Sequence, residues 1–79
     1  MDEFEEGKQK FLELVTTLDG TVEVVIPVTP SQGLFKISLS KGGSRTFLTI
    51  HEDDILDLPE ETSVQEKTTV LLQETIKTL

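Results

Sequence analysis

Cysteine, tryptophan and tyrosine are absent from this chain of 79 residues, and His51 is its single histidine. Without cysteine the chain can form neither a disulfide nor a thiolate metal site. No serine stands in the strand-turn-helix setting that exposes a catalytic nucleophile, and acid–base catalysis would require the histidine to lie in a cleft beside an orienting partner. We therefore expect a surface histidine, no enzymatic activity and no cofactor.

Basic residues are also scarce, since seven lysines and arginines stand against fifteen aspartates and glutamates, for a net charge of −8. Phosphate backbones and anionic lipid surfaces are bound through lysine and arginine, so this balance argues against nucleic acid and membranes as partners. No apolar run approaches the roughly 18 residues that span a bilayer. The acidic residues 1–6 differ from the basic start of a signal peptide, and we expect a cytoplasmic protein.

Three runs of alternating apolar and polar residues are typical of β-strands with one buried face, and they span residues 21–29, 34–40 and 45–51. Gly42 and Gly43, between the last two runs, predict a two-residue type I′ turn, because both of its central positions need the positive φ that glycine adopts without steric penalty. This turn determines which residues lie opposite each other. The apolar set that it gathers on one face is Phe35, Ile37, Leu39, Leu48 and Ile50.

The first run is predicted to join the second through a four-residue loop, residues 30–33, because Pro30 and Gly33 suit such a loop. The loop adds four residues of the first run to the apolar face: Val22, Val24, Ile26 and Val28. Pro27 cannot donate a hydrogen bond within a sheet, so this run is predicted to be the edge strand of a meander.

A helix is expected before the sheet, with Asp2 and Glu5 as its capping pattern and Gly20 as its left-handed end. Its apolar stripe follows the 3.6-residue period and consists of Phe4, Phe11, Val15 and Leu18, flanked by Leu12 and Leu14. Lys8 falls within the stripe, so we expect its stem to lie on the core and its ammonium in water. Gly7 is expected to weaken the first turn.

A second long helix is expected after Pro59, with two alternative N-terminal caps: Thr62 with Gln65, or Ser63 with Glu66. Its stripe consists of Val64, Leu71, Leu72, Ile76 and Leu79, with Thr68 and Thr75 inside it and Val70 on the opposite side. Between the sheet and this helix, residues 52–58 predict a helical turn in which Ile55 and Leu58 close the core.

The predicted order is therefore α-β-β-β-α, a single α+β domain over residues 1–79. It consists of a three-stranded antiparallel meander with two helices packed on one face. Two helices covering one face of the sheet provide an adequate core for a chain near the lower limit of independently stable domains.

This order of elements resembles that of the double-stranded RNA-binding domain, which also packs both helices on one face of a three-stranded sheet. In that family a lysine cluster at the start of the last helix contacts phosphates across a groove. The matching residues here, 60–67, read EETSVQEK and are acidic, so no binding residue is carried over. A nucleic-acid-binding module that uses Lys36, Lys41 and Arg45 is the alternative to the function that we expect.

The face of the sheet opposite the helices carries the main indication of function. The register places Phe47 there beside Val25, with Lys36 and Arg45 nearby, and these are the four partner-binding residues that we predict. An exposed aromatic residue with a flanking arginine is typical of contact hot spots. We therefore expect a small acidic interaction or regulatory module that binds an unknown protein or a second copy of itself. A solvated, lightly apolar sheet face is the plainer interpretation of the same residues.

Carboxylates concentrate at residues 52–57, directly after the histidine. A hard cation needs several converging oxygens, and this run lacks the alternating ligand spacing and the central glycine of a calcium loop. Carboxylates at a helix start also offset the macrodipole. We interpret the run as structural and predict no metal site, with a metal-dependent activity as the remaining alternative. That activity would use Glu52, Asp53, Asp54 and Asp57.

Overall fold

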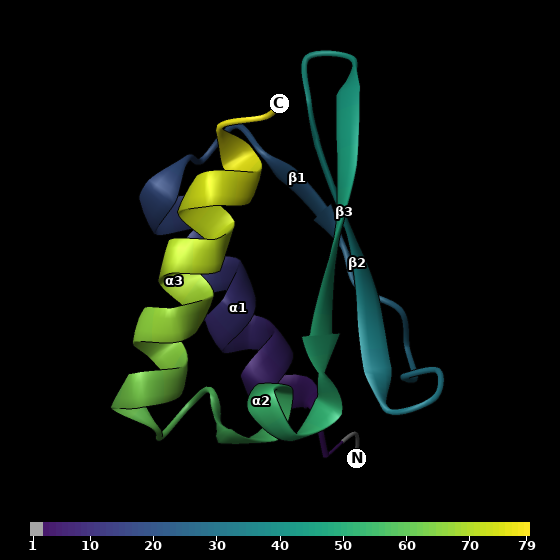
Figure 1. The fold of residues 1–79 in the computed structure, drawn as a ribbon, viewed down its shortest axis with the longest axis vertical. Helices are drawn as coiled ribbons and strands as arrows, with labels where there is room; N and C mark the ends of the chain where they lie inside the picture. Colours follow the sequence, from purple (N-terminus) through teal and green to yellow (C-terminus); the bar gives the residue numbers. More distant parts are fainter. Residues whose placement is uncertain (1–2) are drawn as a thin grey trace.

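A computed structural model describes residues 3–79 of the chain. Its elements are helix α1 (Glu5–Leu18), strands β1 (Glu23–Val25), β2 (Leu34–Lys41) and β3 (Ser44–His51), and helices α2 (Glu52–Asp57) and α3 (Thr62–Ile76). The strands form one antiparallel sheet in the order β1-β2-β3, and the helices lie on one side of it (Figure 1). The predicted α-β-β-β-α order is confirmed, and the predicted helical turn after the sheet is α2.

The hairpin of β2 and β3 has the predicted turn. Gly42 and Gly43 adopt φ values of 54° and 88°, and Lys41 lies opposite Ser44. From there the predicted register continues without a slip to the far end of both strands. The side chains alternate between the two faces of the sheet, so the five apolar residues assigned to the inner face are all buried.

The first predicted strand is correct only near its start. β1 contains Glu23–Val25, which pairs with residues 38–40 in the predicted register. The chain then leaves the sheet and returns at Ser31, which forms an isolated bridge with Leu34. Val28, predicted to lie in the core, is 80% exposed, and that prediction was wrong.

A tighter turn than the predicted four-residue loop explains the difference. Gln32 and Gly33 both have positive φ, at 53° and 76°. Ser31 and Leu34 exchange two backbone hydrogen bonds, with N–O distances of 2.9 and 3.0 Å. These are the features of a two-residue type I′ turn, which reverses the chain later than the predicted loop would.

The later reversal leaves surplus chain, and residues 26–30 stand opposite only residues 35–37 of β2. The surplus bulges out of the sheet instead of forming a ladder. Pro27 and Pro30 lie in this bulge, where their missing N–H groups cost no ladder hydrogen bond. We call residues 26–30 the bulge.

Lys8 contacts the bulge from α1. Its ammonium donates a hydrogen bond to the carbonyl of Val28, with an Nζ–O distance of 2.9 Å, and lies 5.5 Å from the centre of the Phe35 ring. The ammonium lies at the surface, as expected, and the structure adds a backbone carbonyl as its partner. The lysine thereby satisfies a carbonyl that the short first strand leaves outside the ladder.

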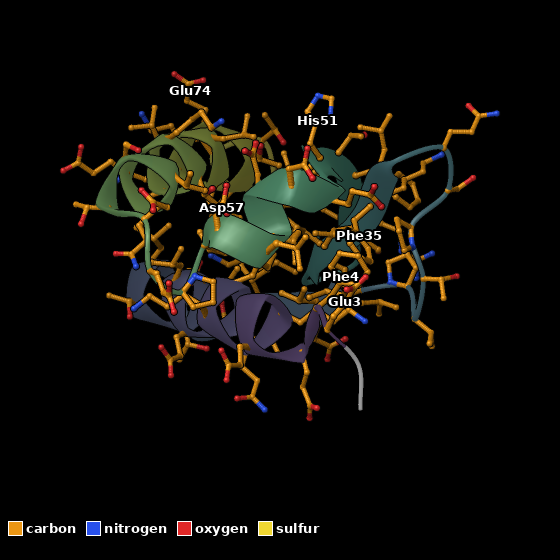
Figure 2. All side chains as sticks on the ribbon, turned by 90° about the horizontal axis from the view of Figure 1, so that it is seen from below. Glu3, Phe4, Phe35, His51, Asp57 and Glu74 are labelled. Atoms are coloured by element: carbon orange, nitrogen blue, oxygen red, sulfur yellow. The ribbon has the colours of Figure 1, made fainter. Side chains whose placement is uncertain are left out.

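The core fills the space between the helices and the inner face of the sheet. Its buried apolar residues are Phe4, Phe11, Val15, Phe35, Ile37, Leu39, Leu48, Ile50, Ile55, Leu58 and Leu72. Phe4 packs edge-on against Phe35, with ring centroids 5.0 Å apart, and the two rings lie together in Figure 2. Val22, Val24 and Ile26 are half-buried against this core.

Gly7 is buried where α1 meets α2. The sequence showed only its cost to the helix. The structure shows what it allows, since a Cβ at this position would overlap the carbonyl oxygen of Ile55. The absence of a side chain therefore lets the backbones of the two helices approach closely.

The ends of α1 differ from the prediction. Asp2 lies outside the described residues, and the N-cap position is Phe4, which makes no side-chain capping bond. Gly20 does not adopt positive φ, so the predicted left-handed cap is wrong. Asp19 stands in extended conformation at the C-cap, and its N–H donates to the carbonyl of Val15.

The start of α3 also differs, because neither predicted cap forms and the N-cap position is Glu61. Gln65 instead donates from its side chain to the carbonyl of Leu58, at 2.9 Å, and so links α2 to α3. Val70 is exposed, as predicted. Leu71, predicted to lie in the buried stripe, is 38% exposed.

We expect Gly7→Ala to lower the free energy of unfolding by roughly 1–3 kcal/mol, because the added methyl group forces two packed helices apart. Gly20→Ala is the matched control, since the nearest atom to its new Cβ would be 3.8 Å away. Urea denaturation of both variants measures the difference. Equal stability of the two variants would contradict the close approach of α1 and α2.

Candidate protein-binding face of the sheet

The face of the sheet that points away from the helices is uncovered (Figure 1). The strand register arranges its residues in rows across β1, β2 and β3. The rows are Glu23, Ser40 and Arg45; Val25, Ser38 and Phe47; Lys36 and Thr49; and Leu34 and His51. We call these residues the outer face.

Two exposed apolar side chains occupy one row of the outer face. Val25 on β1 is 66% exposed and Phe47 on β3 is 53% exposed. Ser38 of β2 lies between them and pairs with both. Its side chain is too small to shield either neighbour. Grouped apolar side chains on a surface, unlike scattered ones, are typical of contact sites.

The predicted basic residues lie on the same face. The ammonium of Lys36 sits 4.8 Å from the ring centroid of Phe47, a cation–π contact. Arg45 occupies the adjacent row, with Glu23 at the other end of that row. Within residues 3–79 the side chains of Glu23 and Arg45 have no hydrogen bond or ion pair. The fold thus brings together Val25, Lys36, Arg45 and Phe47, and their role in binding remains a prediction.

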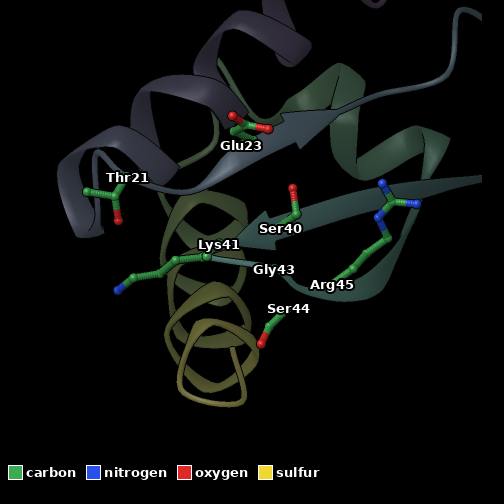
Figure 3. Close-up of a pocket in the computed structure, with 8 residues that line it drawn as sticks. Thr21, Glu23, Ser40, Lys41, Gly43, Ser44 and Arg45 are labelled. Atoms are coloured by element: carbon green, nitrogen blue, oxygen red, sulfur yellow. The ribbon is translucent and has the colours of Figure 1, made fainter.

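Lys41 is turned away from the outer face. A shallow groove at the β2–β3 turn is lined by Thr21, Glu23, Ser40, Lys41, Gly42, Gly43, Ser44 and Arg45. Figure 3 shows Ser40 and Arg45 pointing to one side of the sheet, whereas Lys41 points away from them. The ammonium of Lys41 pairs with the carboxylate of Asp19, at 2.7 Å. Lys41 is therefore paired with an acidic residue and does not add a third cation to Lys36 and Arg45 on the outer face.

Asp19 connects the end of α1 to the β2–β3 turn. One carboxylate oxygen accepts hydrogen bonds from the backbone N–H of Thr21, at 2.9 Å, and from its hydroxyl, at 2.6 Å. The other oxygen accepts from Lys41. These bonds favour the charged carboxylate and hold the pKa of Asp19 well below its ordinary value of 3.8, with Lys41 as the largest cause.

The acidic run does not converge on one point. Asp54 pairs with Lys67 of α3, with an O–N distance of 3.0 Å. His51 and Asp57 lie apart, at opposite ends of α2 (Figure 2). In the described part of the chain, no three histidine, cysteine, aspartate or glutamate side chains form a group that could hold a metal ion.

Comparison of the chain with protein-family models, with curated proteins and with solved structures found no match. None of the helices within residues 3–79 has the length and apolar composition needed to cross a membrane. The outer face is therefore interpreted from its own residues.

Two features of the surface were missed from the sequence. Glu23 was not named as a site residue, although the register already placed it in the row of Arg45. A small groove between the outer edge of β3 and α3 contains Leu71 and His51. The helical period assigned Leu71 to the core. The period identifies one face of the helix, but it does not show whether the sheet reaches far enough to bury every residue on that face.

The low pKa of Asp19 predicts a pH dependence of stability. A carboxylate with a depressed pKa stabilises the fold above its unfolded pKa and loses that contribution as the pH falls through the folded pKa. We therefore expect wild type to be more stable than Asp19→Asn at pH 7, and the gap to shrink as the pH falls below about 4. Urea denaturation between pH 7 and 2 measures the gap.

Asp53→Asn is the control, because this exposed carboxylate has no side-chain hydrogen bond or ion pair within residues 3–79. It should show no comparable gap. A gap for Asp19→Asn that stays constant over the whole pH range would show that its carboxylate is not held by these bonds.

We expect no localised response of residues 52–57 to Ca²⁺ or Mg²⁺, because a hard cation needs several oxygens at one point and these carboxylates diverge. Amide shifts recorded during a titration into the millimolar range measure the response. They should be no larger than those of Glu74, a lone exposed carboxylate on α3. A saturable shift confined to residues 52–57 would show a metal site there.

Proposed function

We propose that this protein is a small, cytoplasmic, non-enzymatic interaction module that binds a partner protein through the outer face of its sheet. The observation that carries the proposal is the row in which Val25 and Phe47 stand exposed on either side of Ser38. The remaining large apolar side chains of β2 and β3 on the inner face are buried. Within the three strands, the large apolar side chains that are exposed are therefore Val25 and Phe47, and both lie on the outer face.

The size of the apolar pair suits a contact of moderate affinity. Full burial of an exposed valine or phenylalanine contributes about 1.5–3 kcal/mol, whereas a micromolar dissociation constant corresponds to about 8 kcal/mol. Because Val25 is 66% exposed and Phe47 53% exposed, covering what remains exposed supplies roughly 2–4 kcal/mol, about a quarter to a half of such an interaction. The cation–π contact with Lys36 also restricts the motion of the Phe47 ring before a partner binds, which lowers the entropy cost of binding.

The charge of the outer face supports a protein partner over nucleic acid. Lys36 and Arg45 are its two cations, and Glu23 in the same surface offsets one of them. Nucleic-acid binding rests on several lysines or arginines that replace the counterions of the phosphates. With a net charge of −8 on the chain, two cations are too few to hold a phosphate backbone. The nucleic-acid alternative therefore has less support.

Phe47→Ser and Val70→Ser compare two apolar side chains of almost equal exposure, 53% on the outer face and 54% on α3. Because both are more than half exposed, we expect both variants to remain folded, with the free energy of unfolding lowered by about 1 kcal/mol or less. Only Phe47→Ser should lose binding, since only it removes the aromatic residue from the outer face.

Tagged wild type and the two tagged variants are each used to capture proteins from an extract of the source cells. Mass spectrometry then measures what each of them has bound. Untagged copies of the chain are included among the candidates for capture. Val70→Ser should retain the proteins that wild type captures, and Phe47→Ser should lose them. Equal capture by all three proteins would overturn the proposal.

A further inference from the structure

We infer that the partner at the outer face is a second copy of this chain, related to the first by a two-fold axis that runs parallel to β2. The inference rests on the proposed function of the outer face and names the protein that binds there. Two neighbouring rows of the outer face support the inference, because each is complementary to the same row of a second copy when β1 of one copy faces β3 of the other.

The symmetry follows from β2 being the central strand of the sheet. Two sheets can pack face to face at about 10 Å with their strands nearly aligned. A two-fold axis along β2, midway between the sheets, keeps each row level with the same row of the partner. It also places β3 of one copy over β1 of the other, and this happens twice in the dimer.

The row nearest the turn gains two ion pairs in this arrangement. Glu23 lies at the β1 end of that row and Arg45 at the β3 end, with Ser40 between them. Glu23 of each copy therefore faces the partner's Arg45. Both side chains are exposed and have no ion pair of their own within residues 3–79, so each is available for the contact.

The next row gains two apolar contacts. Phe47 of each copy faces the partner's Val25, and Ser38 faces the partner's Ser38 at the axis. Serine is small enough to let the apolar side chains on both sides of it meet. Lys36 also lies on β2, but its ammonium leans over Phe47 on β3 and so away from the axis. The two lysines of a dimer lean in opposite directions.

Charge complementarity favours a second copy over other partners. At the contact itself, a uniformly acidic surface would face Glu23 and a uniformly basic surface would face Lys36 and Arg45. The matching surface must present one acid and one base in reversed order, which a second copy does by symmetry. At about 0.15 M salt the Debye length is about 8 Å, so repulsion between charges of the two copies that lie outside the contact is largely screened.

Two charge reversals test the arrangement. Glu23→Arg and Arg45→Glu each put two like-charged pairs into the dimer, so we expect the dissociation constant of either variant alone to rise about tenfold or more. Mixing the two variants in equal amounts restores both ion pairs in a heterodimer. Its dissociation constant should return to within about threefold of wild type. Sedimentation equilibrium at about 0.15 M salt measures the dissociation constants of the two variants and of their mixture.

Glu74→Arg is the control for Glu23→Arg, because it makes the same change in net charge on α3, away from the outer face. Its dimer should keep the dissociation constant of wild type within about twofold. Denaturation curves establish that each variant is folded. Both reversed residues are exposed on the sheet, so we expect their stability to match that of wild type.

The outcomes separate this inference from the proposed function. Dimers that form with wild-type affinity in the mixture, but not with either reversed variant alone, support the two-fold pairing. Monomeric wild type at every concentration, or a mixture no more associated than its components, overturns it. If Phe47→Ser still loses a captured protein in that case, the outer face binds a different partner and the proposed function stands.

Discussion

The tight turn at Gly42 and Gly43 is the constraint on which both the core and the outer face depend. It pairs Lys41 with Ser44, and the register then extends along the full length of β2 and β3. Side chains alternate along a strand, so a shift of one residue would turn Leu48 and Ile50 outward. Each of these residues contributes about 1.5–3 kcal/mol through burial, which makes the shifted register unfavourable. The same alternation leaves Phe47 outside, so one turn determines the interior and the exposed aromatic together.

The parts of the fold that could be predicted are those governed by local chemistry. Two adjacent glycines identify a type I′ turn by themselves, and strict alternation identifies the strands on either side. The turn at Gln32 and Gly33 was missed because glutamine is not among the residues that commonly adopt positive φ. Without that information Pro30 pointed to a longer loop, and Val28 was then counted as a core residue. The error in one turn accounts for the error in the strand before it.

Other errors arose where the outcome depends on segments distant in the sequence. Gly7 has a role only because Ile55, far along the chain, lies against it. Leu71 follows the period of a buried stripe, yet it is 38% exposed in the groove between α3 and β3. The bond between Asp19 and Lys41 joins residues 22 positions apart and replaces the glycine cap that the local sequence suggested. For the candidate site, the positions of Val25, Lys36, Arg45 and Phe47 followed from register alone. Glu23 has a role only in the proposed dimer, where it faces Arg45 of the second copy, and the register within one copy does not reveal this.

The bulge has a consequence for aggregation. A chain that grows into a fibril by adding strands must offer a usable edge on both sides of its sheet. Here the β1 side consists of three paired residues followed by the bulge, which contains two prolines and is held by the hydrogen bond from Lys8. Such an edge is a poor template for another strand. The β3 side is long and regular, but pairing through one edge alone ends after two molecules. Blunting a single edge therefore suffices to prevent open-ended growth, and the other edge can remain unprotected.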